Sequence, residues 1–453
     1  MLPLWLACTP DPTSVGDDDD DDVTHPSGDT GPAVTVDGLV SDARVALHPE
    51  MNTLLVATWT QGAAAEQVWL SWSFEGVEYA SPPFAAPVGP AREVVLGLPA
   101  EVTVPLVLHV VVDGVESVVD LGLRSTAPLP GDLDDPAQTV RDDARARPEP
   151  WLLTSVDVGA NPFFGPCYTV ILDRAGRIVW YRPTTERRLT WQARVSRTGP
   201  HLLIDESGQY SPGEPTASRV SADLVLDEPI DLTGMGTALE ELDDGSILFD
   251  EVQGYQQAWL TRQAPDGART RLWDCTAWMA AYTDQQWACA ANAIVWDAGR
   301  NTVLWSMFAV STVAEIDLGT GAVVNEFGEY PGGHLFSPLD SAFDLQHMPN
   351  WTADGTLIAS MHGQGGTEQW AREYTVDAQQ LTQVWSARAD EFAPYAGHAQ
   401  KLPTGNVLWT IGTAGVIREL SRDGAAVWDA AWPGHLVGNS TPLADLYALT
   451  APR

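Results

Sequence analysis

The chain has 453 residues, of which 44% are hydrophobic and 19% are charged, so it is too apolar for wholesale disorder and long enough for more than one packed core. Removing six consecutive aspartates, Asp17 to Asp22, raises the formal net charge only from −37 to −31, and such an acidic surface excludes nucleic acid as a partner. The 39 Gly, 33 Pro and 19 Trp predict an all-β fold of short strands and tight turns.

Residues Met1 to Cys8 resemble the tail of a bacterial lipoprotein signal, a short apolar run that ends in a small residue and a cysteine. No basic segment precedes the run, and it is shorter than a complete signal. We therefore expect translation to start upstream and Cys8 to be lipidated; a chance match is the alternative. Residues 9–32 are rich in Asp, Pro, Gly, Ser and Thr, and we expect a disordered acidic stalk.

These features predict an exported cell-envelope lipoprotein, in the periplasm or on the outer surface. No apolar run of about 18 residues follows, so we expect membrane contact only through the lipid anchor.

Residues 33–126 alternate apolar and polar residues in short runs, such as TLLVATW from Thr53 and VWLSWSF from Val68, which predicts a β-sandwich. The early Trp-bearing strand and the phrase VLGLPAEVTVPLVLHVVVDG resemble fibronectin type III domains, with Val104 and Pro105 near the position of the usual tyrosine. Residues 127–150 carry repeated Pro, Asp and Arg and are expected to form a linker.

Residues 151–453 repeat two kinds of hairpin. One has a Gly turn before a β run, as in LDDGSILF from Leu242 and LPTGNVLW from Leu402. The other ends in an aromatic or apolar residue, as in ILDRAGRIVWY from Ile171 and ELSRDGAAVW from Glu419. Two hairpins make a four-stranded blade, and at about 50 residues a blade the segment predicts a six-bladed β-propeller, with seven blades as the main alternative. Incomplete first and last copies suggest that the two ends share a blade.

Cys275 and Cys289 flank a short loop and are expected either to pair in an oxidising compartment or to remain buried thiols. Metal-ligand spacing such as CxxC is absent, so no metal site is expected. The sequence leaves the state of Cys167 open.

The pairing of L-x-x-G-x-I/V-L strands with E-x-x-x-x-G-x-x-V-W hairpins is similar to the bacterial arylsulfotransferase family. These periplasmic propellers move a sulfuryl group between phenols. The likeness spans most of 151–453 and rests on four stretches, 237–249, 292–317, 346–385 and 397–428. It implies a histidine nucleophile that forms a sulfohistidine, with further histidines and an arginine around the developing negative charge.

The family places its nucleophile in a "QHD" phrase eight residues before a turn glycine. Here Gln346 and His347 precede Gly355 at that spacing, so the resemblance assigns the nucleophile to His347. The other family positions are replaced: an "HD" pair falls on Thr237 and Ala238, and an "H-x-N-S-I" phrase keeps Asn292 and Ile294. An "SSR" strand end falls on Ser306, Met307 and Phe308, so two histidines and the arginine are missing.

A relocated cluster is one way to rebuild such a site, from His347, His362, His398 and Arg372, with Asn292 as a further supporting residue. The alternative is that these histidines are scattered and share no site.

Two functions follow. The chain is either an arylsulfate sulfotransferase with weak or lost activity, acting on an aryl sulfate donor and a phenolic acceptor, or a non-catalytic surface propeller that binds a ligand or protein. Neither domain has a nucleotide-binding loop, so no cofactor is expected. A positive pocket around His347 would favour sulfuryl transfer, because the donor is anionic and the surface is acidic.

Overall fold

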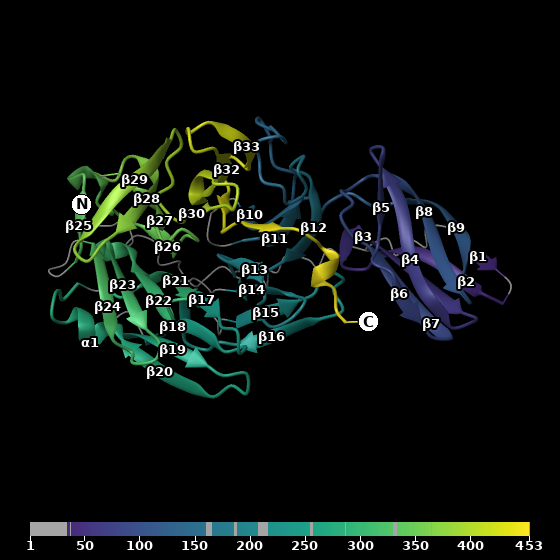
Figure 1. The fold of residues 1–453 in the computed structure, drawn as a ribbon, viewed down its shortest axis with the longest axis horizontal. Helices are drawn as coiled ribbons and strands as arrows, with labels where there is room; N and C mark the ends of the chain where they lie inside the picture. Colours follow the sequence, from purple (N-terminus) through teal and green to yellow (C-terminus); the bar gives the residue numbers. More distant parts are fainter. Residues whose placement is uncertain are drawn as a thin grey trace, which may run out of the picture.

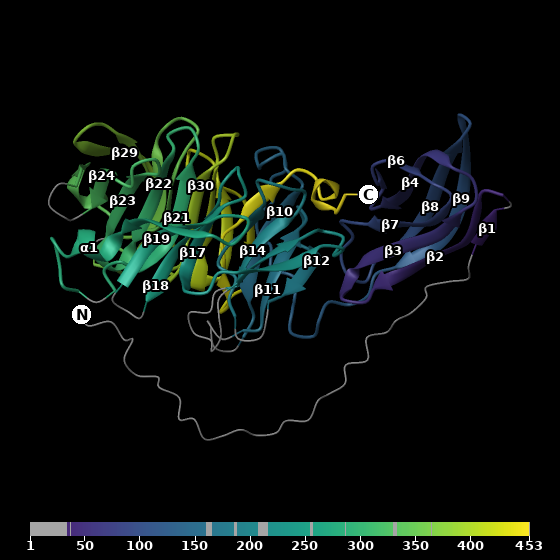
Figure 2. The ribbon, with the colours of Figure 1, turned by 90° about the horizontal axis from the view of Figure 1, so that it is seen from below.

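A computed structural model describes residues 34–36, 38–159, 165–184, 188–206, 216–253, 257–285, 287–328, 333–363 and 365–452. Two β domains lie side by side, a smaller one built from the first nine strands and a larger one built from the rest (Figures 1 and 2). The chain is therefore all-β, with a sandwich followed by a propeller, as the sequence predicted.

The sandwich has two antiparallel sheets, with strand orders β1-β2-β3-β7 and β5-β4-β8-β9, and β6 pairs with β4. Buried residues alternate with exposed ones along β4 and β8, so one side of each sheet faces a common apolar core and the other faces outward. The strands are β1 (Val34–Val36), β2 (Val40–His48), β3 (Met51–Gln61), β4 (Ala65–Phe74), β5 (Val77–Ala80), β6 (Phe84–Ala86), β7 (Gly89–Val95), β8 (Thr103–Val112) and β9 (Val115–Ser125).

The residues that the structure describes from Trp151 on form six sheets, most of them simple meanders of four consecutive strands. In the first three sheets the strands are β10 (Trp151–Asp157), β11 (Cys167–Leu172) and β12 (Ile178–Pro183); β13 (Ala193–Val195), β14 (Leu202–Glu206), β15 (Thr216–Val220) and β16 (Asp227–Asp231); and β17 (Met235–Glu241), β18 (Ile247–Gln253), β19 (Gln257–Gln263) and β20 (Arg269–Asp274). In the next three they are β21 (Ala291–Asp297), β22 (Thr302–Met307), β23 (Thr312–Asp317) and β24 (Val323–Gly328); β25 (Leu335–Ser337), β26 (His347–Trp351), β27 (Leu357–His362), β28 (Gln369–Val376) and β29 (Gln380–Ala389); and β30 (His398–Lys401), β31 (Val407–Ile411), β32 (Val416–Leu420) and β33 (Ala426–Ala431).

The last strands of the chain complete the first sheet of the propeller. β34 (Leu436–Val437) and β35 (Thr441–Leu443) both pair with β10, on the side away from β11. The prediction that the two ends of the repeat region share a blade is therefore confirmed, and pairing across this sheet closes the ring.

Hydrogen bonds tie the innermost strands of neighbouring sheets together. Thr237 Oγ1 donates to the carbonyl of Ala291 at 2.6 Å, and Asn350 Nδ2 donates to the carbonyl of Ala399 at 2.8 Å. Between the sixth and first sheets, Gln400 Nε2 donates to the carbonyl of Ser440 at 2.5 Å. Because these ties are buried or half-buried, the ring is held by polar contacts at its centre as well as by its apolar layers.

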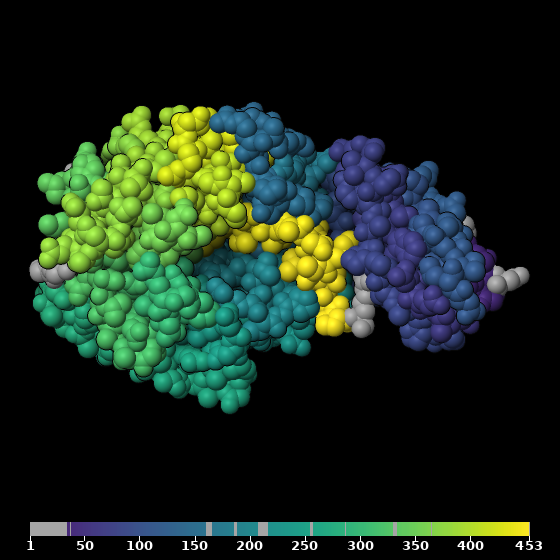
Figure 3. Space-filling view, viewed as in Figure 1, coloured from purple at the N-terminus to yellow at the C-terminus, as the bar shows by residue number. Residues whose placement is uncertain are grey.

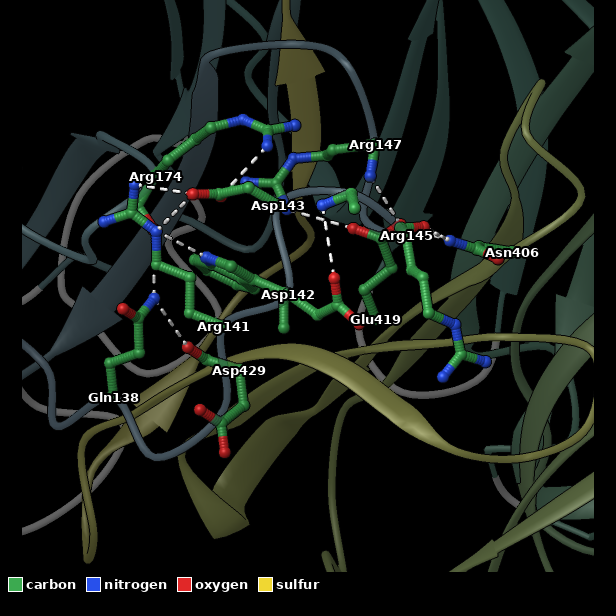
Figure 4. Close-up of polar contacts among 12 residues, drawn as sticks. Gln138, Arg141, Asp142, Asp143, Arg145, Arg147, Arg174, Asn406, Glu419 and Asp429 are labelled. Carbon is green, nitrogen blue, oxygen red and sulfur yellow. Dashed lines mark hydrogen bonds and ion pairs between the residues drawn. The ribbon is translucent and has the colours of Figure 1, made fainter.

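Residues 127–150 are packed against the propeller, although the sequence suggested only a linker. They run beside β33, where Ala137 and Arg141 form bridges with Ala431 and Trp428. Figure 4 shows the polar contacts of this segment with the ring. Arg147 is buried over the Trp428 ring and forms an ion pair with the equally buried Glu419 at 3.2 Å. The segment therefore holds the sandwich at a fixed place on the ring.

A second contact between the domains comes from the C-terminal segment, which lies between them in yellow in Figure 3. The short 3-10 helix η4 (Tyr447–Leu449) presents the Tyr447 hydroxyl, which donates to the carbonyl of Val94 at 2.8 Å and accepts from the N–H of Leu96 at 3.2 Å. Apolar residues of both domains, Met51 and Val94 among them, share one core cluster with the first sheet of the propeller.

The loop between β20 and β21 contains the one α-helix among the described residues, α1 (Cys275–Met279), which is capped by Asp274. In the structure Cys275 is joined to Cys289 by a disulfide, with 5.8 Å between the Cα atoms. Three further 3-10 turns, η1 (Phe308–Val310), η2 (Leu339–Ser341) and η3 (Gly412–Ala414), follow or precede strands of the ring.

Candidate channel site

His347 and His398 occupy equivalent positions in neighbouring sheets. Each begins the innermost strand of its sheet, and each pairs with the second strand, His347 with Ser360 and His398 with Thr410. The residues two positions earlier, Leu345 and Ala396, both have left-handed backbone angles, with φ of 48° and 60°. Such angles are uncommon outside glycine, so the repeated turn marks this face of the ring, where the inner strands begin, as a candidate site. We call it the site face.

His347 is neutral and has a defined tautomer. Its Nδ1 lies 2.9 Å from the carbonyl oxygen of Leu345, and because a carbonyl only accepts, Nδ1 carries the proton and Nε2 carries the lone pair. Burial lowers the pKa of His347 to about 4, and the nearby imidazole of His362 acts in the same direction. At neutral pH the ring can therefore accept a hydrogen bond or attack an electrophile through Nε2.

His362 lies near His347, at the end of the second strand of the same sheet. Its Nε2 donates to the carbonyl of Ala393 at 2.9 Å, which leaves Nδ1 as an acceptor, buried and without a partner. Burial lowers the pKa of His362 as well. Phe308, from η1, stacks on His347 with 5.9 Å between the ring centres.

Among the described residues, Arg194 is the one charged residue that shifts the pKa of His398. Burial, then Arg194, lower the pKa of His398 to about 4, and its Nδ1 is buried without a partner. Arg194 itself bonds Glu240 and Gln192 through two short contacts. The carboxylate of Glu240 offsets part of the charge of Arg194.

Met348 crosses the axis of the ring. Its sulfur lies 3.8 Å from Nε2 of Gln192, which precedes β13. Two sheets separate these residues in either direction around the ring, so the contact joins opposite sides of the ring. Met348 has a φ of 46°, which turns its side chain away from the regular strand pattern directly after His347.

Asn292 supports the nucleophile candidate indirectly. Its Nδ2 donates to the carbonyl of Gln346 at 2.7 Å and so holds the residue before His347. The side chain of Gln346 donates through Nε2 to Ser306 and to the carbonyl of Thr312. The oxygens of both amides, Asn292 Oδ1 and Gln346 Oε1, are buried without a partner.

Arg372 does not join these residues. It lies on the third strand of its sheet, stacks over Trp370 at 4.8 Å, and donates to the carbonyl of Asp340 in η2 at 2.9 Å. The structure thus brings His347, His362 and Asn292 together, places His398 at the equivalent position of the next sheet, and puts Arg372 in another environment.

Two buried carboxyl groups lie on the second strands of the second and third sheets, Asp205 on β14 and Asp250 on β18. Asp205 accepts from the N–H groups of Trp191 and Gln192, and Asp250 accepts from those of Thr237 and Ala238. Burial raises the pKa of each to about 7. Both hold inner strands in place, and neither adds positive charge to the channel.

Among the described residues, no group of three or more His, Cys, Asp or Glu is arranged to hold a metal, and no helix is long and apolar enough to cross a membrane. Cys8 lies outside the described residues. Cys167 is buried, and burial raises the pKa of its thiol to about 12, so it is an unreactive core residue.

Gln192, Arg194 and Met348 were not found from the sequence. They come from opposite sides of the ring, and nothing local in the sequence signals that they meet. The paired short motifs LQH before Met348 and AGH before Ala399, each with its histidine in last place, are the one signal that could have shown His347 and His398 as equivalents.

Comparisons with known proteins give likeness of fold only. No family model matches the chain, and no curated protein matches it. Among solved structures, TolB from Acinetobacter baumannii is 12% identical, with 76% of this chain and 80% of that one covered and a TM-score of 0.44. A protein of unknown function from Bacteroides caccae is 15% identical over 63% and 94%, with a TM-score of 0.44. A catalytically inactive virginiamycin B lyase from Staphylococcus aureus with quinupristin is 12% identical over 65% and 87%, with a TM-score of 0.38. These neighbours differ in function, and the chain is similar to them as a propeller-like β protein.

Proposed function

We propose that the propeller binds a neutral, hydrogen-bond-donating molecule at its site face and does not transfer sulfuryl groups. The observation that carries this proposal is the character of the unpartnered polar atoms around His347. They are lone pairs: Nε2 of His347, Nδ1 of His362 and the amide oxygens of Asn292 and Gln346. Hydroxyl or N–H groups of a ligand would satisfy them, whereas the oxygens of a sulfate would face these same lone pairs and be repelled.

The lack of an available cation near His347 among the described residues also favours binding over sulfuryl transfer. Sulfuryl transfer needs donors or cations placed where negative charge develops, and the loss of one such donor commonly costs about 100- to 1000-fold in rate. Arg194 is paired with Glu240, and Arg372 is engaged elsewhere.

Sulfuryl transfer through His347 is the second candidate, favoured by its neutral imidazole. In this reaction Nε2 would attack the sulfur of an aryl sulfate, the bond from sulfur to the aryl oxygen would break, and the phenolate would leave. A second phenol would then take the sulfuryl group from the histidine and release its proton to solvent.

The two candidates are separated by the complete chain and its His347→Ala variant, assayed with 4-nitrophenyl sulfate as donor and phenol as acceptor. We expect nitrophenol release at the background rate from both. Turnover comparable to that of an intact arylsulfotransferase, abolished by His347→Ala, would establish the transferase and refute the binding proposal.

Binding is tested by thermal unfolding with phenol, inorganic sulfate or 4-nitrophenyl sulfate added. A ligand that binds only the folded chain raises the melting temperature, and we expect phenol to do so more than either anion. The effect should be lost in His398→Ala and His347→Ala. Equal stabilisation by sulfate would contradict a site built of acceptors.

We further propose that the chain is exported and anchored through Cys8. The disulfide between Cys275 and Cys289 supports an oxidising compartment. Mass spectrometry of the mature protein tests this: a lipidated N-terminal Cys8 is expected, and a mature chain that keeps Met1 would refute it.

A further inference from the structure

A hydrogen-bonded chain of three side chains crosses the outer face of the sandwich, far from the channel. His109 on β8 stands between Ser71 on β4 and Glu116 on β9. Its Nε2 is 2.7 Å from the hydroxyl oxygen of Ser71, and its Nδ1 is 2.7 Å from Oε1 of Glu116. A nucleophile, a base and a group that orients the base are thus linked in order.

The strand register explains how three separate strands present these groups together. His109 lies opposite Trp69 on one side and Val118 on the other. Ser71 and Glu116 each lie two residues along from those partners, so both are diagonal neighbours of His109 on the same face. The residues between them, such as Leu70 and Leu108, point into the core.

The tautomer of His109 is the one that a general base needs. A carboxylate only accepts hydrogen bonds, so Nδ1 of His109 carries a proton and donates a hydrogen bond to Glu116. Nε2 is then unprotonated, and its lone pair accepts a hydrogen bond from the Ser71 hydroxyl. The imidazole is also held in plane by Trp69, which stacks on it at 4.6 Å with an interplanar angle of 7°.

Substrate could reach this chain of residues from solvent. The His109 side chain is 18% exposed and that of Glu116 is 49% exposed. Val118, directly opposite His109, is 59% exposed and offers an apolar contact beside the base.

We propose that Ser71 is a nucleophilic serine that takes the acyl group of activated aryl esters. Ser71 Oγ attacks the ester carbonyl carbon while His109 Nε2 takes the hydroxyl proton, and Glu116 stabilises the resulting imidazolium. The bond from the carbonyl carbon to the aryl oxygen then breaks, and the leaving phenol takes the proton from His109. Water attacks the Ser71 ester in the same way, with His109 as base, and releases the carboxylic acid.

The strand pairing around Ser71 limits which acyl compounds can react with it. β4 pairs with β5 on one side and β8 on the other, so within the described residues the backbone N–H groups beside Ser71 belong to the sheet and none is free to bind an oxyanion. Esters with a good leaving group depend least on stabilisation of the oxyanion, whereas amides depend on it most. The activity is therefore confined to activated esters, and peptides are not substrates.

The test uses the complete chain with 4-nitrophenyl acetate and with a fluorophosphonate probe, followed by peptide mapping. Ser73 provides the matched control, because it lies on the same strand and face, two residues from Ser71. A positioned general base commonly contributes about 100- to 10,000-fold. We expect Ser71 to be labelled at least about 100-fold faster than Ser73, and nitrophenol release to fall to background in Ser71→Ala and to stay unchanged in Ser73→Ala.

His109→Phe keeps a ring to stack on Trp69 and should slow labelling by about 100-fold or more. Labelling of the wild type should be slower in D₂O, and this dependence should vanish in His109→Phe, which a purely structural role would not cause. Glu116→Gln, which changes the positioning residue, should give an intermediate rate. If His109→Phe does not fold, as judged by circular dichroism, His109→Gln replaces it.

Labelling of Ser71 no faster than Ser73, or a rate indifferent to both His109 variants, would overturn the proposal. Either result would leave the channel proposal standing, because the channel lies in the other domain.

Discussion

The ring of the propeller and the outer face of the sandwich place their polar side chains in different environments. The propeller buries them, as in the Arg147–Glu419 ion pair, the carboxyl groups of Asp205 and Asp250, and the amide ties around its axis. The sandwich buries fewer, Gln61 and Glu93 among them, and places Ser71, His109 and Glu116 on its outer face. Buried polar groups should therefore govern the stability of the propeller, whereas the three groups on the outer face of the sandwich should be free to change with little effect on folding.

The largest effect is expected for Arg147→Ala. Both side chains of the Arg147–Glu419 pair are at most 1% exposed, so the variant leaves a buried carboxylate without its cation. Breaking such a pair typically costs about 3–5 kcal/mol, measurable by urea unfolding. Arg145→Ala is the control, because Arg145 and its partner Asp423 are 47% and 70% exposed, and its cost should stay below about 1 kcal/mol. Equal losses for the two variants would remove the contrast between buried and exposed pairs.

The next effect depends on pH. Burial raises the pKa of Asp250 to about 7 from an ordinary value of 3.8, so the folded ring favours the protonated carboxyl. Its contribution to stability is complete below about pH 4 and is lost as the pH rises through 7. Asp250→Asn keeps an oxygen to accept from the N–H of Ala238 and should stabilise the chain at pH 8 by roughly 1–4 kcal/mol, with little change at pH 4.

Asp243→Asn, in an exposed turn of the same sheet, serves as the matched control and should leave the pH profile unchanged. A stabilisation by Asp250→Asn that is the same at pH 4 and pH 8 would show that ionisation of Asp250 is not its source.

Reduction of the Cys275–Cys289 disulfide should cost about 3 kcal/mol, because it frees a loop of 14 positions in the unfolded chain. The sandwich contains no cysteine, so the loss should appear only in the unfolding of the propeller. Calorimetry with and without a reductant measures it, and the Cys275→Ala/Cys289→Ala variant should lose stability without reductant. Unchanged melting after the thiols have been shown to be free would contradict the prediction.

The smallest effect is expected in the sandwich. Glu116→Gln removes an exposed partner of His109, and such pairs contribute about 0.2–1 kcal/mol. Unfolding of this variant should therefore be nearly that of the wild type, even though acylation of Ser71 is slowed. A loss above about 2 kcal/mol would show that the outer face is part of the structural framework after all.

The fold was predictable because it depends on sequence patterns within short segments. Gly turns and strand alternation in Leu242–Phe249 and Leu402–Trp409 repeat at a regular spacing, and each of these turns closes a hairpin between strands that are adjacent in the sequence. The packing of 127–150 was not predictable, because it depends on pairing between Arg141 and Trp428, which are far apart in the sequence.

The site was predictable only in part, for the same reason. The position of His347 before a turn glycine is a local feature, and so is its neighbour Gln346. That Met348 reaches Gln192, or that Arg194 acts on His398, depends on closure of the whole ring. The Ser71–His109–Glu116 chain depends on the register of three strands, which alternation alone does not fix.

Ring closure by β34 and β35 has a consequence for the order of folding. During synthesis the inner edge of β10 stays unpaired until nearly 280 further residues have been added, since Asp157 pairs with Leu436. At about 5–20 residues per second, the inner edge of the first sheet stays open for roughly 14 to 56 seconds of synthesis. An unpaired strand edge invites association with other chains. The sandwich can fold early because its strands are local, but the contacts that Tyr447 makes with Val94 and Leu96 form only after the ring has closed. The sandwich can meet β12 earlier, through Asn52 and Tyr181, but the C-terminal part of the junction between the two domains is completed last.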